Sequence, residues 1–161
     1  IFKECDFSKI HASNIRFVEC EFVDCNFSNT VITNTAFKNI RFLNCKLLGV
    51  KFNECDAFLL QFYFKGCQLN FSSFYKLKIQ QTHFVNCSLQ EVDFTATNLS
   101  ESLFDQCDLK NAVFEDTNLE KVDFRTAVGF SMNPNENKLK GAKFNRASID
   151  GLLSGFKIVI E

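Results

Sequence analysis

Large apolar residues recur every five positions along most of this chain. The series runs from position 2 to position 52, mostly as Phe, restarts at position 59 and continues as Leu, Phe or Ile to position 124. A smaller residue stands two positions before most of these large residues. A five-residue period matches neither an amphipathic helix, with apolar residues at i, i+3, i+4 and i+7, nor a strand with strict alternation.

The small and the large residue of each unit are two positions apart, so both point to the same side of an extended backbone. The two mostly polar residues that follow must then turn the chain. Four such turns close a coil of 20 residues, and successive coils can hydrogen-bond as parallel strands about 4.8 Å apart. The pattern therefore predicts an all-β solenoid, a right-handed β-helix of quadrilateral section.

Two residue types mark the same 20-residue period. Phe occurs at 2, 22, 42, 64, 84, 104 and 124, and Cys at 5, 25, 45, 67, 87 and 107. Both series contain one step of 22, which predicts a two-residue insertion between about 53 and 63. A period this regular is typical of stacked repeats in a solenoid.

The clearest five-residue units are Thr97-Asn98-Leu99, Cys107-Asp108-Leu109, Ala112-Val113-Phe114 and Thr117-Asn118-Leu119. They resemble the pentapeptide repeat family, whose loose consensus is Ala-(Asp/Asn)-Leu-x-x. The resemblance covers residues 1–124 and resumes at 137–149. It implies the same quadrilateral β-helix.

The end of the chain departs from the repeat. We expect the β-helix over 1–126, a loop over 127–138 that contains the only Pro, and a last partial coil with Leu139, Phe144 and Ile149 in phase. Ser148 is predicted to cap a short helix that stops at Gly155, and residues 157–161 read as a strand. This ending either caps the open coil or pairs with a second copy around a two-fold axis.

The quinolone-resistance members of the family end in a similar helix and strand and dimerise through them. The resemblance therefore implies a homodimer, with residues 139–161 as the capping and dimerisation module. The predicted dimer contacts are Leu152, Leu153, Phe156, Ile158 and Ile160.

The cysteine spacing suits neither a zinc site nor a disulfide framework. Zinc sites need clustered pairs such as Cys-x-x-Cys, whereas the closest pair here is Cys20 and Cys25. The six in-register cysteines are predicted to form a ladder of buried thiols that act as small apolar residues, although a bond between adjacent coils stays possible by distance. Reduced thiols favour a cytoplasmic location.

Charge changes sign along the chain. Between 38 and 81 there are seven basic residues against Glu54 and Asp56. Between 91 and 123 only Lys110 and Lys121 oppose nine carboxylates, which are Glu91, Asp93, Glu101, Asp105, Asp108, Glu115, Asp116, Glu120 and Asp123. This run is either an ordinary solvated surface or an acidic surface for a basic partner. The net charge of −1 argues against direct binding to nucleic acid or to an anionic membrane.

Irregular apolar residues follow the insertion. Phe58, Leu60, Tyr63, Phe71 and Tyr75 fall at positions that should face outward. They are either covered, by a bulge or by a segment upstream of Ile1, where the chain opens in mid-repeat, or they form an exposed contact patch.

Catalysis finds no support in the residue pattern. The two histidines, His11 and His83, are far apart in the repeat, and no nucleophile–base pair, phosphate-binding Gly-rich loop or metal-ligand cluster stands out. We expect no enzyme activity, cofactor or metal. The resemblance implies instead a DNA mimic that binds a type II topoisomerase, DNA gyrase, and modulates quinolone sensitivity. The alternative is an interaction scaffold for another protein.

Overall fold

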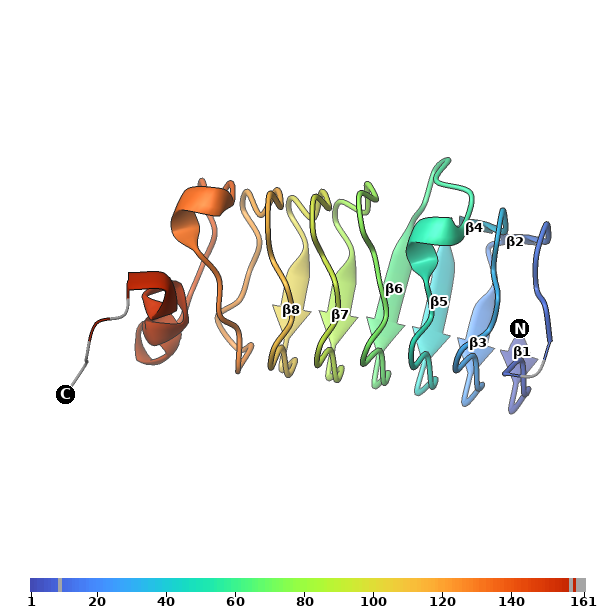
Figure 1. Ribbon diagram of the computed structural model, residues 1–161. Helices are drawn as coiled ribbons and strands as arrows, with labels where there is room; N and C mark the ends of the chain where they lie inside the picture. The colour runs from blue at the N-terminus through green and yellow to red at the C-terminus, as the bar shows by residue number, and fades with distance from the viewer. Residues whose placement is uncertain (9, 157, 159–161) are drawn as a thin grey trace.

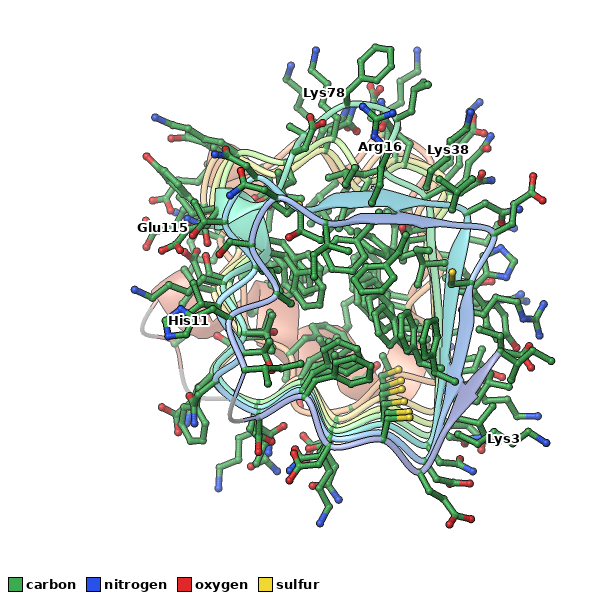
Figure 2. The ribbon with its side chains drawn as sticks, turned by 90° about the vertical axis from the view of Figure 1, so that its right-hand side faces the viewer. Lys3, His11, Arg16, Lys38, Lys78 and Glu115 are labelled. Carbon is green, nitrogen blue, oxygen red and sulfur yellow. The ribbon has the colours of Figure 1, made fainter. Side chains whose placement is uncertain are left out.

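The computed structural model describes residues 1–8, 10–156 and 158, and it forms a four-sided parallel β-helix that winds as a right-handed coil (Figures 1 and 2). The strands are β1 (Phe2–Lys3), β2 (Arg16–Val18), β3 (Glu21–Val23), β4 (Ala36–Lys38), β5 (Ile40–Leu43), β6 (Phe62–Lys65), β7 (His83–Val85) and β8 (Leu103–Asp105). The 3-10 helices are η1 (Phe52–Glu54), η2 (Pro134–Glu136), η3 (Arg146–Leu152) and η4 (Ser154–Phe156). The predicted fold class is confirmed.

One wall of the coil is a six-stranded parallel sheet in the order β1-β3-β5-β6-β7-β8. Its register pairs each Phe of the predicted column with the next, as in Phe22 with Phe42 and Phe42 with Phe64. Strands β2 and β4 form a two-stranded sheet, and isolated parallel bridges join the remaining coils. The 20-residue period and its single 22-residue step are thus the actual strand register.

The four walls are named here by features visible when the rod is viewed along its axis (Figure 2). The β1 face carries Lys3, and the cysteine face is the wall next to the row of sulfur atoms at the bottom of the view. The Glu115 face carries His11 and Glu115, and the β2 face carries Arg16, Lys38 and Lys78.

Stacked phenyl rings fill the interior. Phe42 is fully buried, and its ring lies 5.2 Å from that of Phe22 and 5.4 Å from that of Phe64, with interplanar angles of 15° and 6°. Rings from the neighbouring column meet these edge-on, as Phe27 meets Phe42 at 88°. Stacked and edge-to-face contacts are the favoured aromatic geometries, so one column specifies the position of the next.

The small interior positions are more than spacers. The hydroxyl of Thr117 donates a hydrogen bond of 2.9 Å to the carbonyl of Phe94 in the preceding coil. The thiol of Cys107 donates in the same way to the carbonyl of Phe84 at 3.3 Å. The prediction of a buried cysteine ladder is confirmed for five of the six cysteines, whereas Cys5 in the first coil is half-buried. Several of these thiols also act as donors between coils.

The insertion is arranged differently from the prediction. Leu59 was expected inside the coil, yet 56% of it is exposed, and it has a left-handed backbone with a φ of 56°. Phe62 is buried instead, and its ring packs 5.9 Å from that of Phe37. Residues 57–61 therefore bulge outward between Asp56, which still pairs with Ala36, and β6.

The first coil is less buried than the repeat suggested. Ile10 and Ile15 occupy small interior positions, but they are 47% and 39% exposed. The side chains of a coil are covered by the coils on both sides, and no described coil precedes this one. Ala12 and Phe17 of the same coil are nevertheless buried.

The C-terminal helix begins earlier and is tighter than predicted. The cap is Asn145, whose side chain accepts a hydrogen bond from the amide of Ala147, whereas Ser148 lies inside η3. Gly155 lies within η4 rather than after a helix. Ile149 leaves the apolar column and is 44% exposed. Of the predicted strand over 157–161, only residue 158 lies among the described residues.

The predicted loop keeps part of the coil. Val128 and Lys138 make parallel bridges to Asp108 and Asn118 in the preceding coil. Phe130 and Met132 are buried. The backbone amide of Met132 donates to the carbonyl of Gly151, which ties η3 to the end of the rod.

Candidate functional site

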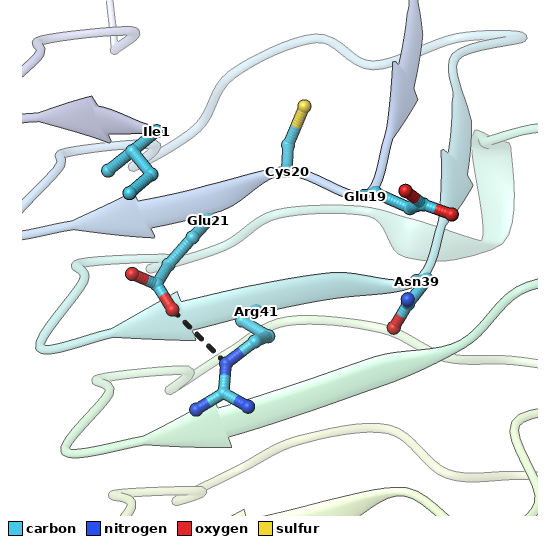
Figure 3. Close-up of a pocket in the computed structure, with 6 residues that line it drawn as sticks. All are labelled: Ile1, Glu19, Cys20, Glu21, Asn39 and Arg41. Atoms are coloured by element: carbon cyan, nitrogen blue, oxygen red, sulfur yellow. Dashed lines mark ion pairs between the residues drawn. The ribbon is translucent and has the colours of Figure 1, made fainter.

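The hollows on the rod surface are shallow. Figure 3 shows one at the N-terminal end, where the Nε of Arg41 lies 3.2 Å from a carboxylate oxygen of Glu21. The Cys20 thiol beside them donates to the carbonyl of Val18 at 3.4 Å. Neither His11 nor His83 lines this hollow, so the half-buried thiol has no imidazole base.

The histidines lie on different faces, as predicted. His11 projects from the Glu115 face (Figure 2). His83 is the first residue of β7 on the β1 face, with its ring 6.2 Å from that of Tyr63. Tyr63 in turn lies under the Arg41 guanidinium, 4.6 Å from the ring centre. Within residues 1–8, 10–156 and 158, no three His, Cys, Asp or Glu side chains form a group that could hold a metal ion.

Two of the buried thiols, those of Cys55 and Cys67, are poor nucleophiles. Burial raises the pKa of Cys55 to about 12, with a smaller contribution from the charge of Asp56. The pKa of Cys67 is also raised, first by its hydrogen bond with Cys45 and then by one with Cys87 and by burial. Reactive cysteines are thiolates near neutral pH, so these two side chains contribute to core packing instead.

The nine predicted carboxylates surround the rod on all four faces. Asp105 and Asp123 lie on the β1 face, and Asp108 and Glu91 on or beside the cysteine face. The other five, on or at the edges of the Glu115 and β2 faces, are Asp93, Glu115, Asp116, Glu120 and Glu101. They do not form a single acidic wall.

Two of these carboxylates form ion pairs with neighbouring cations. Glu101 pairs with Lys121 at 2.9 Å, and Asp123 with Arg125 at 2.7 Å. Hydrogen bonds from Gln81 and then from Lys121 lower the pKa of the Glu101 carboxyl.

Three more carboxylates accept hydrogen bonds from polar neighbours. Asp93 accepts from Ser73, Asp105 from Thr126 and Asp108 from Gln90. Among the described ion pairs, none involves Glu91, Glu115 or Asp116, and these three are exposed. The most available negative charge therefore lies on the Glu115 face and at its edge.

The region after the insertion contains exposed apolar side chains. Phe58 is 73% exposed, Phe71 is 61% exposed and Tyr75 is 38% exposed, whereas Leu60 and Tyr63 are half-buried. No described segment covers the first three. They lie at different corners of the coil, so they do not form one continuous patch.

A groove on the β2 face was not anticipated from the sequence. It is lined by Arg16, Val18, Ala36, Lys38, Asp56, Phe58 and Leu59. These residues come from three successive coils at matching positions of the repeat. The 20-residue period predicts that these positions lie side by side, but it predicts the groove only if Leu59 lies outside the coil.

The predicted dimerisation residues divide into two groups. Leu152 is half-buried against the core of the rod, and Leu153 is half-buried as well. Phe156 and Ile158 are exposed at 54% and 56%. Ile160 lies outside the described residues.

No helix in the described part of the chain is both long and apolar enough to cross a membrane. This finding concerns helices only.

Comparison with known proteins identifies the repeat. The family model described as "Pentapeptide repeat region" matches residues 1–74, 57–126 and 77–153. No curated protein matches the chain significantly.

The chain is similar in fold to several solved structures. Full-length QnrB1, a plasmid-mediated fluoroquinolone resistance protein, superposes with a TM-score of 0.64 at 18% identity, covering 98% of this chain and 87% of QnrB1. A trypsin-treated QnrB1 variant gives a TM-score of 0.56 at 19% identity, with 99% and 87% covered. HetL, a pentapeptide repeat protein involved in heterocyst differentiation regulation from the cyanobacterium Nostoc sp. strain PCC 7120, gives 0.54 at 13% identity, with 89% and 84% covered. At these identities the likeness establishes the fold.

Proposed function

The chain belongs to the pentapeptide repeat family, and we propose that it acts without catalysis, as a stiff rod that binds other proteins. The first candidate partner is a type II topoisomerase, DNA gyrase, which the rod would engage in place of DNA and whose quinolone sensitivity it would modulate. The resemblance to quinolone-resistance members motivates this choice. The rod would work as a homodimer. Its compartment would be the cytoplasm, because eight free cysteines suit a reducing environment.

The observation that carries the proposal is the distribution of carboxylates over residues 91–123. B-form DNA carries phosphates around its whole circumference, so carboxylates on every face suit a mimic better than a single acidic wall does. Coils about 4.8 Å apart cannot match a rise of about 3.4 Å per base pair. The mimicry would therefore rest on overall charge and shape, with the exposed Glu91, Glu115 and Asp116 contributing charges that take part in none of the described ion pairs.

The experiment is a supercoiling assay with purified gyrase, with and without a fluoroquinolone. We expect the rod either to inhibit supercoiling or to protect the enzyme from the drug. The test variant reverses two exposed carboxylates, Glu115→Lys with Asp116→Lys. Asp105 is a weaker choice because it accepts a hydrogen bond from Thr126.

The matched control is Glu19→Lys with Asp24→Lys, which makes the same change in net charge near the other end of the rod, also at exposed positions. The test pair should weaken gyrase binding and make the remaining binding less sensitive to salt, because charge steering is screened. If the test and control variants weakened binding equally, the interaction would depend only on the net charge of the rod. No effect of the parent protein on gyrase would reject this partner.

The second candidate function is a scaffold for another protein. It is favoured by the exposed Phe58, since apolar side chains left in solvent often mark contact sites. Binding of a partner that is lost in Phe58→Ala, with no effect of the rod on gyrase, would support this reading over the first.

A further inference from the structure

The groove on the β2 face combines apolar walls with two cations, Arg16 and Lys38, that take part in none of the described ion pairs. Its residues form two rows along the rod, with Arg16, Ala36 and Asp56 in one row and Val18, Lys38 and Phe58 in the other. Ala36 is the shortest side chain of its row, so the surface is hollowed between its long neighbours. The hollow measures about 300 Å³.

Apolar side chains form one wall of this groove without being needed by the core. Phe58 and Leu59 belong to the bulge over residues 57–61, where Phe62 fills the interior in their place. Val18 on β2 is also exposed, at 47%. Leaving two large apolar residues in water at the tip of a bulge forgoes their burial, roughly 1.5–3 kcal/mol for each side chain, which a partner could recover.

The charge of the groove indicates what such a partner would carry. Among the described residues, neither Arg16 nor Lys38 makes an ion pair. Lys78 projects from the same face (Figure 2). Asp56 contributes one negative charge, but one of its carboxylate oxygens already accepts the Phe58 amide at 3.0 Å. The net positive rim therefore complements carboxylates.

We propose that this groove binds a short acidic segment of a partner protein that inserts one large apolar side chain beside Phe58 and Leu59. The carboxylates of the segment would pair with Lys38, which lies in the same row as Phe58, and with Arg16 in the other row. Exposed cations with apolar tips also occur in proteins that bind anionic membranes. This groove is concave and contains Asp56, so it fits a peptide better. A membrane-binding surface would instead present a protruding apolar edge to the lipid.

The inference is separate from gyrase binding, because the groove lies in the N-terminal half of the rod, away from residues 91–123, and it rests on the scaffold reading, to which it gives a specific site. The two proposals can fail separately. Groove variants should leave any effect on gyrase unchanged, and the reversal at Glu115 and Asp116 should leave peptide binding unchanged.

The test is selection of peptides from a random 12-residue phage library on the full chain, with counter-selection on a Phe58→Ala, Lys38→Glu variant. We expect enriched peptides to share an aromatic or Leu residue flanked by Asp or Glu. Fluorescence anisotropy with the most enriched peptide should then show at least about tenfold weaker binding to Phe58→Ala, a loss that corresponds to about 1.4 kcal/mol.

Two control variants separate the groove from general surface effects. Phe71→Ala removes another exposed Phe, and Lys46→Glu reverses an exposed lysine on the cysteine face. Both should bind the peptide like the parent, and circular dichroism should show the parent fold for every variant. The inference is overturned if no peptide survives counter-selection, if the enriched peptides lack acidic residues, or if Phe71→Ala weakens binding as much as Phe58→Ala. It is also overturned if phosphatidylserine vesicles, rather than peptides, bind in a Phe58-dependent way.

Discussion

The hydroxyl of Thr97 donates a 2.8 Å hydrogen bond to the backbone carbonyl of Phe74, which lies 23 residues earlier in the chain. The same relation recurs between Thr117 and Phe94. A buried polar group is tolerated when it is hydrogen-bonded. Where such a position carries Thr or Cys, its hydroxyl or thiol can therefore hold successive coils together, in addition to the backbone ladder.

Ser72 is the exception to this arrangement. It lies between Val50 and Val92 in its column, and its buried hydroxyl has no hydrogen-bond partner among the described residues. Ser72→Ala should therefore stabilise the fold by roughly 1 kcal/mol, because an unsatisfied buried hydroxyl costs about 1–3 kcal/mol. Urea unfolding measures the change. The matched control is Thr97→Val, which removes a satisfied hydroxyl and should destabilise by about 1 kcal/mol. A loss of stability in Ser72→Ala would contradict the prediction.

The phenyl column should dominate stability. Phe42→Ala removes a fully buried ring stacked between Phe22 and Phe64, and we expect a loss of about 3–5 kcal/mol in the free energy of unfolding. Phe71→Ala, at an exposed corner, should change it by less than about 0.5 kcal/mol. Denaturant unfolding of both variants makes the comparison. A loss below about 1 kcal/mol in Phe42→Ala would mean that this ring is not part of a packed column.

The column was predictable because its signal is repeated. Phe22, Phe42 and Phe64 each occupy one register of the same period, so an error at one coil would break the pairing of all the others. Parallel strands in register also leave little freedom, since a one-residue slip would turn every interior side chain outward. The fold class, the strand register and the cysteine ladder all follow from this redundancy.

Single features were less predictable. The period locates the two-residue insertion only within about ten residues, and both Leu59 and Phe62 are apolar enough to fill the interior. Packing against Phe37 decides in favour of Phe62. At the C-terminus, Asn145 and Ser148 are both good capping residues, and only the geometry of η3 selects Asn145.

The candidate surfaces were partly predictable for the same reason. Outward positions can be counted along the repeat, so the outward positions of Phe58 and Glu115 were predictable, whereas the exposure of Phe58 was one of two alternatives. Which carboxylates are neutralised depends on neighbours 20 residues away, such as Lys121 beside Glu101. The groove depends on Ala36 being short between Arg16 and Asp56, a relation among three coils that no short sequence window contains.

Alkaline pH should destabilise the rod through Cys55. Burial raises the pKa of this thiol from its ordinary value of 9.0 to about 12. The neutral thiol is therefore favoured in the folded state. Its contribution to stability is fully present below pH 9 and is lost as the pH rises from 9 towards 12, at up to about 1.4 kcal/mol per pH unit. Unfolding measured between pH 8 and pH 11 should show this fall, and Cys55→Ala should reduce its slope. An unchanged slope in Cys55→Ala would show that Cys55 is not its source.

The C-terminal end should hold two rods together. Phe156 and Ile158 are about half exposed, while the neighbouring Leu152 already packs against the core. A surface that leaves apolar residues beside an anchored one can bury them in an isologous contact with a second copy. We expect the full chain to sediment as a dimer at micromolar concentration. Phe156→Glu with Ile158→Glu should weaken the dimer by at least about tenfold, because charges would enter an apolar contact.

Both substituted side chains are exposed in the single chain, so the double variant should keep its circular dichroism spectrum and its urea midpoint at low protein concentration. Val128→Glu is the matched control, since Val128 is 58% exposed in the coil before the C-terminal helices. It should leave the dimer intact. A monomeric parent chain would reject dimerisation, and a double variant that still dimerises would place the contact elsewhere on the rod.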